Sequence, residues 1–108
     1  LACAAATAVL ETMRDERLPE RAEEMGRYFM GRLNALREKH AKIKEVRGLG
    51  LMVGMELQVP EAKAVMLRCL ENGLVINATG DTVLRFLPPL IVTRDEIDRA
   101  VEILDDSL

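Results

Sequence analysis

The 108-residue sequence predicts an α+β domain, a small antiparallel sheet of about four strands that is covered by helices on one face. Four segments carry apolar residues at helical spacing, and others carry them at the two-residue period of a strand. Hairpin-length links join the predicted strands in pairs. The predicted order is helix, helix, strand, strand, helix, strand, strand, helix, and residues 1–108 are expected to form a single domain around one core.

The first helix is predicted over residues 1–17, where alanine dominates and Ala6, Leu10 and Met13 recur at helical spacing. The sequence starts inside this amphipathic segment, with no initiator Met, no charged n-region and no cleavage pattern. We therefore expect the chain to be a fragment of a longer protein.

A second helix is expected to start at Leu18 and Pro19, because proline suits a first helical turn and the glutamates that follow suit the positive end of the helix dipole. Its apolar positions recur at helical spacing and form one stripe. They are Leu18, Ala22, Met25, Phe29, Leu33 and Leu36.

Two strands are predicted after this helix. Residues 43–46 indicate a short strand, residues 47–50 its turn, and residues 51–57 a second strand. Alternate residues of the second strand share one face, and the apolar set consists of Leu51, Val53, Met55 and Leu57. Gly54 belongs to the other face and leaves room there for a close neighbour.

The third helix is expected to open at Pro60 and to end at Asn72 and Gly73, with glycine placed for a left-handed cap. Its apolar positions are Ala62, Val65, Met66, Cys69 and Leu70. Residues 74–77 and 83–87 are then the third and fourth strands, joined by a turn at Gly80 and Asp81. Two prolines at positions 88 and 89 stop the fourth strand, since proline lacks the ladder donor.

The last helix has the strongest signals. Thr93 and Glu96 form a capping box, and Val92 and Ile97 occupy the two positions of a hydrophobic staple. The buried stripe is predicted to consist of Ile97, Ala100, Val101 and Leu104.

Composition excludes several function classes. Hydrophobic residues make up 49% of the chain and aromatic residues 3%, so Leu, Val, Ile, Ala and six Met are expected to fill the core. The net charge of −3 is spread along the chain without the basic stripe that nucleic acid requires, and no apolar run approaches the roughly 20 residues of a membrane span.

Cys3 and Cys69 lie in helical patterns without metal or redox spacing, so we expect two small buried residues in a reducing compartment.

No catalytic, cofactor-binding or metal-binding residue is predicted in this chain. Residues 48–54 nearly match the dinucleotide fingerprint, but the third glycine is one place late and a strand follows, which favours a tight turn with positive φ at glycine. His40 has no nucleophile beside it in a recognisable motif, and two cysteines with one histidine make no zinc set. The lysines lie in polar surroundings that do not suit a Schiff base, and they are Lys39, Lys42, Lys44 and Lys63.

Arg85 is the candidate ligand-binding residue, because it lies inside the apolar strand predicted at residues 83–87. Val83 and Leu87 share its face, so we expect a buried or half-buried guanidinium that needs an anionic partner. The partner is either Glu56 on the second predicted strand or the carboxylate of a ligand, which a guanidinium matches with two parallel hydrogen bonds. The pattern alone leaves these two alternatives open.

Three stretches together resemble a known family. Residues 46–54 (VRGLGLMVG), 73–77 (GLVIN) and 84–90 (LRFLPPL), with the capping box behind them, are similar to the C-terminal part of class III pyridoxal-phosphate aminotransferases, in particular the acetylornithine and ornithine aminotransferase group. The opening residues 1–6 also look like the helix that follows the family's phosphate-binding loop. The resemblance covers essentially all 108 residues in order.

The resemblance implies the small C-terminal domain of a fold-type-I enzyme, expected to be a cytoplasmic homodimer with active sites at the subunit interface. It implies transfer of an amino group from N-acetylornithine to 2-oxoglutarate through pyridoxal 5'-phosphate, in arginine biosynthesis, and it matches Arg85 to the arginine that clamps the substrate α-carboxylate. The family's Schiff-base lysine, ring-nitrogen aspartate and phosphate-binding threonine belong to upstream segments. The fragment alone is therefore expected neither to hold the cofactor nor to turn over substrate.

Two alternatives stay open at this point. The first is another class III enzyme, such as an ornithine or 4-aminobutyrate aminotransferase or an aminomutase, whose substrates carry their carboxylates differently. The second is a freestanding ligand-binding or assembly module without catalysis.

Overall fold

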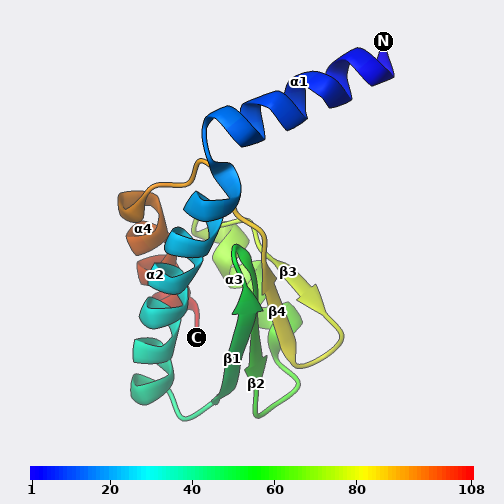
Figure 1. Cartoon of the computed structure of the whole chain (residues 1–108). Helices are drawn as coiled ribbons and strands as arrows, with labels where there is room; N and C mark the ends of the chain where they lie inside the picture. The colour runs from blue at the N-terminus through cyan, green and yellow to red at the C-terminus, as the bar shows by residue number, and fades with distance from the viewer.

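The computed structural model describes all 108 residues and contains four helices and one sheet of four strands (Figure 1). The helices are α1 (Ala2–Asp15), α2 (Leu18–Lys39), α3 (Ala62–Glu71) and α4 (Arg94–Ser107). The strands are β1 (Ile43–Leu49), β2 (Met52–Leu57), β3 (Asn77–Thr79) and β4 (Val83–Phe86). Every neighbouring pair is antiparallel in the order β1-β2-β4-β3, and α2, α3 and α4 cover one face of the sheet (Figure 1). The predicted fold class and element order are confirmed.

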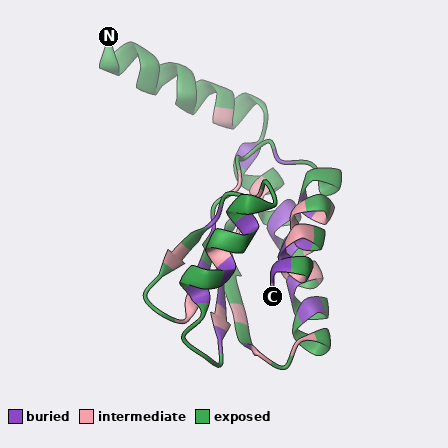
Figure 2. Ribbon diagram, turned by 180° about the vertical axis from the view of Figure 1, so that it is seen from behind, coloured by how far each residue is buried: buried purple, intermediate pink, exposed green.

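The core lies between the sheet and these three helices, and Figure 2 shows the buried residues on their facing sides. The predicted stripe of α2 is buried at Leu18, Met25, Phe29, Leu33 and Leu36. Phe29 meets Phe86 of β4 edge to face, with ring centroids 5.5 Å apart. Two of the three aromatic residues of the chain therefore pack against each other between α2 and the sheet.

Helix α2 approaches the β1–β2 turn so closely that backbone touches backbone. A Cβ atom on Gly26 of α2 would lie 2.0 Å from the carbonyl oxygen of Gly50. Gly50 itself has a φ of +56°, as predicted for the glycine turn. Gly26 therefore allows the helix backbone to approach the turn, and Gly50 allows the turn to adopt a positive φ.

The boundaries of the β1–β2 hairpin differ from the prediction. Strand β1 continues through Arg47 and Gly48 to Leu49, whereas the sequence indicated a turn over residues 47–50. Glycine in the stretch suggested a turn, but antiparallel pairing with β2 holds these residues in the ladder. The predicted apolar face of β2 is confirmed, since Leu51, Val53, Met55 and Leu57 are all buried.

The third strand lies later than predicted. Residues 74–76 form a loop, and β3 starts at Asn77, because pairing with β4 runs from Asn77 opposite Arg85 to Thr79 opposite Val83. Helix α3 likewise starts at Ala62 instead of Pro60, and β4 ends at Phe86. The turn between β3 and β4 is confirmed, with Gly80 at a φ of +71°.

Helix α4 is confirmed in detail. Thr93 Oγ1 accepts from the amide of Glu96 at 3.2 Å, and the Glu96 carboxylate accepts from the amide of Thr93 at 2.9 Å. The staple residues Val92 and Ile97 are buried. The capping box therefore fixes the start of this helix as the sequence predicted.

Helix α1 projects away from the rest of the molecule and contains no buried residue (Figures 1 and 2). The prediction that Cys3 is buried is therefore wrong, whereas Cys69 of α3 is buried and both thiols are free. Of the six methionines expected in the core, only Met25 and Met55 are buried, and Met52 is 64% exposed. No helix combines the length and apolar character that a membrane crossing requires.

Candidate functional site

The side of the sheet away from the helices, here called the open face, presents mainly charged, polar and small residues, together with a few apolar ones. Its side chains come from alternate positions of the four strands, opposite to those that enter the core. The open face comprises Glu45, Arg47, Leu49, Met52, Gly54, Glu56, Asn77, Thr79, Val83 and Arg85.

One row of this face crosses all four strands. Arg47 of β1 lies opposite Gly54 of β2, Gly54 opposite Arg85 of β4, and Arg85 opposite Asn77 of β3. Side chains of directly opposed residues are neighbours on one face of an antiparallel sheet. Glycine in the second place therefore leaves a gap between the two arginines.

Arg85 is exposed, so the expectation of a buried or half-buried guanidinium is wrong. The physical reason is that Leu84 and Phe86 occupy the core side of β4, at 0% and 5% exposure, and send Arg85 to the side that no helix covers. Leu87, taken as its apolar neighbour, is itself 55% exposed. Arg85 forms no hydrogen bond and no ion pair within the chain.

Glu56, the predicted internal partner of Arg85, is paired elsewhere. Lys44 donates to one of its carboxylate oxygens at 2.8 Å and Arg47 donates to the other at 2.8 Å. These two cations, Lys44 first, hold the pKa of the Glu56 carboxyl below its ordinary value. Arg47 also contacts Glu45 at 3.1 Å, so two cations and two carboxylates balance one another. This network removes the internal alternative for Arg85 and leaves its charge uncompensated.

A shallow cavity of about 340 Å³ opens beside Arg85, between β1 and the β3–β4 hairpin. Its lining includes Arg47, Gly54, Thr79, Val83 and Arg85. Leu49 and Met52 also line it and are 88% and 64% exposed, which gives the site an apolar edge. A carboxylate with an aliphatic chain is complementary to this combination of one free guanidinium and an apolar edge.

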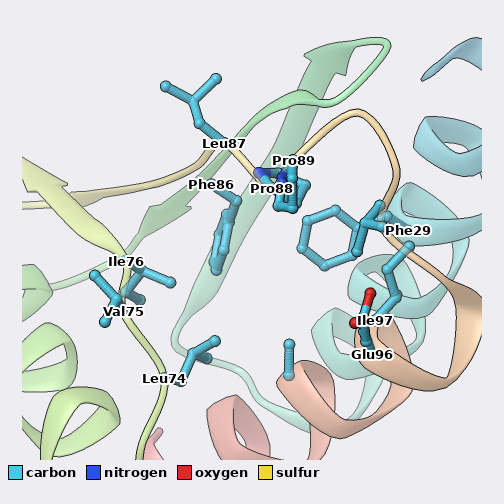
Figure 3. Close-up of a pocket in the computed structure, with 12 residues that line it drawn as sticks. Phe29, Leu74, Val75, Ile76, Phe86, Leu87, Pro88, Pro89, Glu96 and Ile97 are labelled. Carbon is cyan, nitrogen blue, oxygen red and sulfur yellow. The ribbon is translucent and has the colours of Figure 1, made fainter. Parts of the chain in front are cut away.

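A second cavity, of about 370 Å³, lies at the other end of β4 (Figure 3). Leu74, Val75 and Ile76 line one side, and Ile97 and Glu96 of α4 line another (Figure 3). Glu96 is its single charged residue and is already engaged in the capping box. Although slightly larger, this cavity is lined by no polar side chain that is free to orient a ligand, so the open face is the better candidate.

The remaining candidates from the sequence are structural. His40 caps α2 and contacts Asp105 of α4 through Nε2 at 2.5 Å. Burial raises the pKa of the Cys69 thiol, which makes it a poor nucleophile. Three lysines, Lys39, Lys42 and Lys44, form ion pairs, and Lys63 is exposed.

The role of Arg47 was not predicted from the sequence, which placed residue 47 in a turn. A signal was present, because Glu56 and Gly54 alternate with the buried residues of β2 and so share its open face. Arg47 lies beside them because β1 continues to Leu49. The sequence did not predict this length, since Gly48 and Gly50 indicated a turn.

Comparison with known proteins places these observations in a family. The family pattern of class-III aminotransferases matches residues 1–108, and the chain belongs to this family. An acetylornithine aminotransferase of Caldanaerobacter subterraneus subsp. tengcongensis is 49% identical over all of this chain and 28% of that protein. An ornithine aminotransferase of Geobacillus sp. is 44% identical over 94% of this chain and 25% of that protein.

Solved structures agree with the sequence comparison. The crystal structure of an acetylornithine aminotransferase from Elizabethkingia anophelis superimposes with a TM-score of 0.92 and 35% identity, over 98% of this chain and 29% of that chain. A lysine aminotransferase from M. tuberculosis superimposes with a TM-score of 0.88 and 29% identity, over 93% of this chain. The chain thus spans between 23% and 29% of the length of these relatives.

Proposed function

We propose that this chain is the C-terminal small domain of an enzyme that transfers an amino group between N-acetylornithine and 2-oxoglutarate, a step of arginine biosynthesis. The names of the relatives with 44–49% identity support the amino-acid class of substrate. The observation that carries the proposal is Arg85, an unpaired guanidinium on the open face of the sheet, beside a cavity.

Arg85 is proposed to hold a carboxylate of the amino acid or the 2-oxo acid. A guanidinium donates two parallel hydrogen bonds to a carboxylate, which fixes the direction of the substrate as well as its position. Orientation of a substrate before reaction lowers the entropic part of the barrier. The rest of the enzyme is proposed to exclude water from this pair when the substrate is bound, and loss of a desolvated charge pair costs about 2–5 kcal/mol, a factor of about 30 or more.

Pyridoxal phosphate is proposed as the cofactor of the intact enzyme, since class III aminotransferases depend on it. None of the four lysines of this chain suits a Schiff base with it, because three are ion paired and the fourth is exposed, so none is desolvated. The cofactor site is therefore proposed to lie in the rest of the enzyme, and the contribution of this chain is to bind and orient the substrate.

The substrate assignment is tested on the full-length enzyme with N-acetylornithine, ornithine and 4-aminobutyrate as amino donors and 2-oxoglutarate as acceptor. The highest kcat/KM is expected with N-acetylornithine. A higher kcat/KM with ornithine or 4-aminobutyrate would assign the chain to another enzyme of the family. Absence of transamination with all three donors would favour a non-catalytic ligand-binding or assembly module.

The role of Arg85 is tested separately by Arg85→Ala in the same enzyme. We expect KM for the amino donor to rise and kcat/KM to fall by a factor of about 30 or more, while the absorbance of the bound cofactor is retained. An unchanged kcat/KM would reject the carboxylate role. Loss of cofactor absorbance would instead show that the substitution disturbs the cofactor site.

A homodimer is proposed for the intact enzyme, located in the cytoplasm. Exposed apolar side chains support burial against further protein, since Val9 and Leu10 of α1 are 57% and 66% exposed and Leu49 of the open face is 88% exposed. Both cysteines are free, as expected in a reducing compartment. Light scattering on the intact enzyme tests the dimer.

A further inference from the structure

Gly54 occupies the centre of β2, directly between the two arginines of the open face. Its partner on β1 is Arg47 and its partner on β4 is Arg85. A glycine in the interior of a strand weakens the strand, because it has the largest backbone entropy to lose and no side chain to pack. Such a glycine is expected only where a bulge, a special backbone conformation or a close approach requires it.

The fold does not require glycine at this position. A Cβ atom on Gly54 would meet its nearest neighbours at 3.9 Å, which is ordinary van der Waals contact, whereas the same atom on Gly48 would lie 2.6 Å from the carbonyl oxygen of Met52. The glycines with positive φ are Gly50, Gly73 and Gly80. The register shift of the β1–β2 pair falls at residues 43–45, so Gly54 is not in a bulge.

The gap at Gly54 is part of the cavity of about 340 Å³ that Arg85 also lines. An occupant of the gap lies beside a guanidinium without a partner, because the neighbouring Arg47 is already satisfied by Glu45 and Glu56. A neutral segment of protein that covered this gap would bury the Arg85 charge unpaired, which is strongly unfavourable. An occupant that displaces water from the gap must therefore carry an anion to Arg85.

We propose that Gly54 is a specificity-determining position of the substrate site, and that the missing side chain provides the space in which the carbon next to the bound carboxylate lies. This inference rests on the proposed role of Arg85. A methyl or larger group at position 54 displaces that carbon and lengthens the hydrogen bonds from the guanidinium to the carboxylate. Substrate affinity then falls although the fold is unchanged.

The test uses the full-length enzyme with Gly54→Ala, Gly54→Val and, as a control, Gly31→Ala. Gly31 lies on the exposed side of α2 and a Cβ there meets nothing within 4 Å. The measured quantities are the inhibition constant of glutarate, an unreactive dicarboxylate, and the melting temperature. The inhibition constant is expected to rise in the order Gly31→Ala, Gly54→Ala, Gly54→Val, by about tenfold or more for valine, without a lower melting temperature for Gly54→Ala.

Arg85→Ala separates failure of this inference from failure of the proposed function. In an Arg85→Ala background no carboxylate is held beside position 54, so adding Gly54→Val is expected to change the inhibition constant little further. If Arg85→Ala weakens glutarate but both Gly54 variants bind it like the wild type, the inference is wrong and the role of Arg85 stands. If Arg85→Ala also leaves glutarate binding unchanged, both are wrong. A lower melting temperature for Gly54→Ala with unchanged inhibition would show that protein, not substrate, packs against Gly54.

Discussion

Arg47 Nη1 lies 2.8 Å from Glu56 Oε2 across the β1–β2 ladder, and this contact determines the electrostatics of the open face. Glu56 is also bound by Lys44, so both of its carboxylate oxygens are engaged by cations other than Arg85. Both arginines flank Gly54, yet only Arg85 keeps an uncompensated charge. The proposed ligand-binding role of Arg85 thus depends on the neutral network of Lys44, Arg47, Glu45 and Glu56 beside it.

The Glu56 network predicts a specific acid sensitivity. The folded-state pKa of Glu56 lies below its ordinary value of 4.5, so its carboxylate contributes stability that is fully present above that pH and is lost as the pH falls through the folded-state pKa. Glu56→Gln is expected to lower stability at neutral pH and to flatten its decline below pH 4.5. Urea unfolding at a series of pH values measures both effects, with the exposed and unpaired Glu102→Gln as control. An identical acid profile for wild type and Glu56→Gln would contradict the account.

The contact between α2 and the hairpin turn predicts opposite effects at two glycines. Gly26→Ala places Cβ 2.0 Å from the Gly50 carbonyl oxygen and is expected to destabilise the fold by about 1–3 kcal/mol, because backbone must move. Gly31→Ala on the exposed side of the same helix is expected to stabilise it by about 0.5–1 kcal/mol through helix propensity. Chemical denaturation measures the free energy of unfolding of both variants. An unchanged free energy of unfolding for Gly26→Ala would show that the turn can move away from the helix without loss of stability, which contradicts the prediction.

The capping box of α4 predicts a moderate loss of stability in Thr93→Ala. The substitution removes the acceptor for the Glu96 amide, and such losses are typically about 0.5–2 kcal/mol. Thr12→Ala on the exposed helix α1 is a suitable control, since its hydroxyl forms no hydrogen bond. Thermal unfolding of the two variants is the measurement, and equal stability of Thr93→Ala and wild type would mean that the staple residues alone fix this helix start.

Much of the fold follows from the sequence because periodicity and caps are local signals. The stripe of α2, the buried face of β2 and the box at Thr93 each depend on side chains only a few residues apart, and all three predictions are confirmed. Strand boundaries depend instead on pairing between distant segments. Leu49 and Thr79 are strand residues because of their partners Met52 and Val83, which no local pattern specifies.

The sequence identified Arg85 as the candidate ligand-binding residue, but it did not predict the surroundings of this side chain. The position of an arginine inside an apolar strand indicated that Arg85 needs an anionic partner. Its exposure and the loss of Glu56 as a partner follow from the register of β1, β2 and β4, which is a tertiary property. The importance of Gly54 likewise depends on which side chains flank it across the ladder.

The most direct measurement compares Arg85→Ala with Arg47→Ala in the full-length enzyme, under identical conditions, as kcat/KM for N-acetylornithine. Both substitutions remove one guanidinium from the same row of the sheet, so they differ mainly in whether that guanidinium was free. We predict a loss of about 30-fold or more for Arg85→Ala and a clearly smaller loss for Arg47→Ala, whose charge is already balanced by Glu45 and Glu56. An equal or larger loss for Arg47→Ala would contradict the assignment of Arg85 as the carboxylate-binding residue.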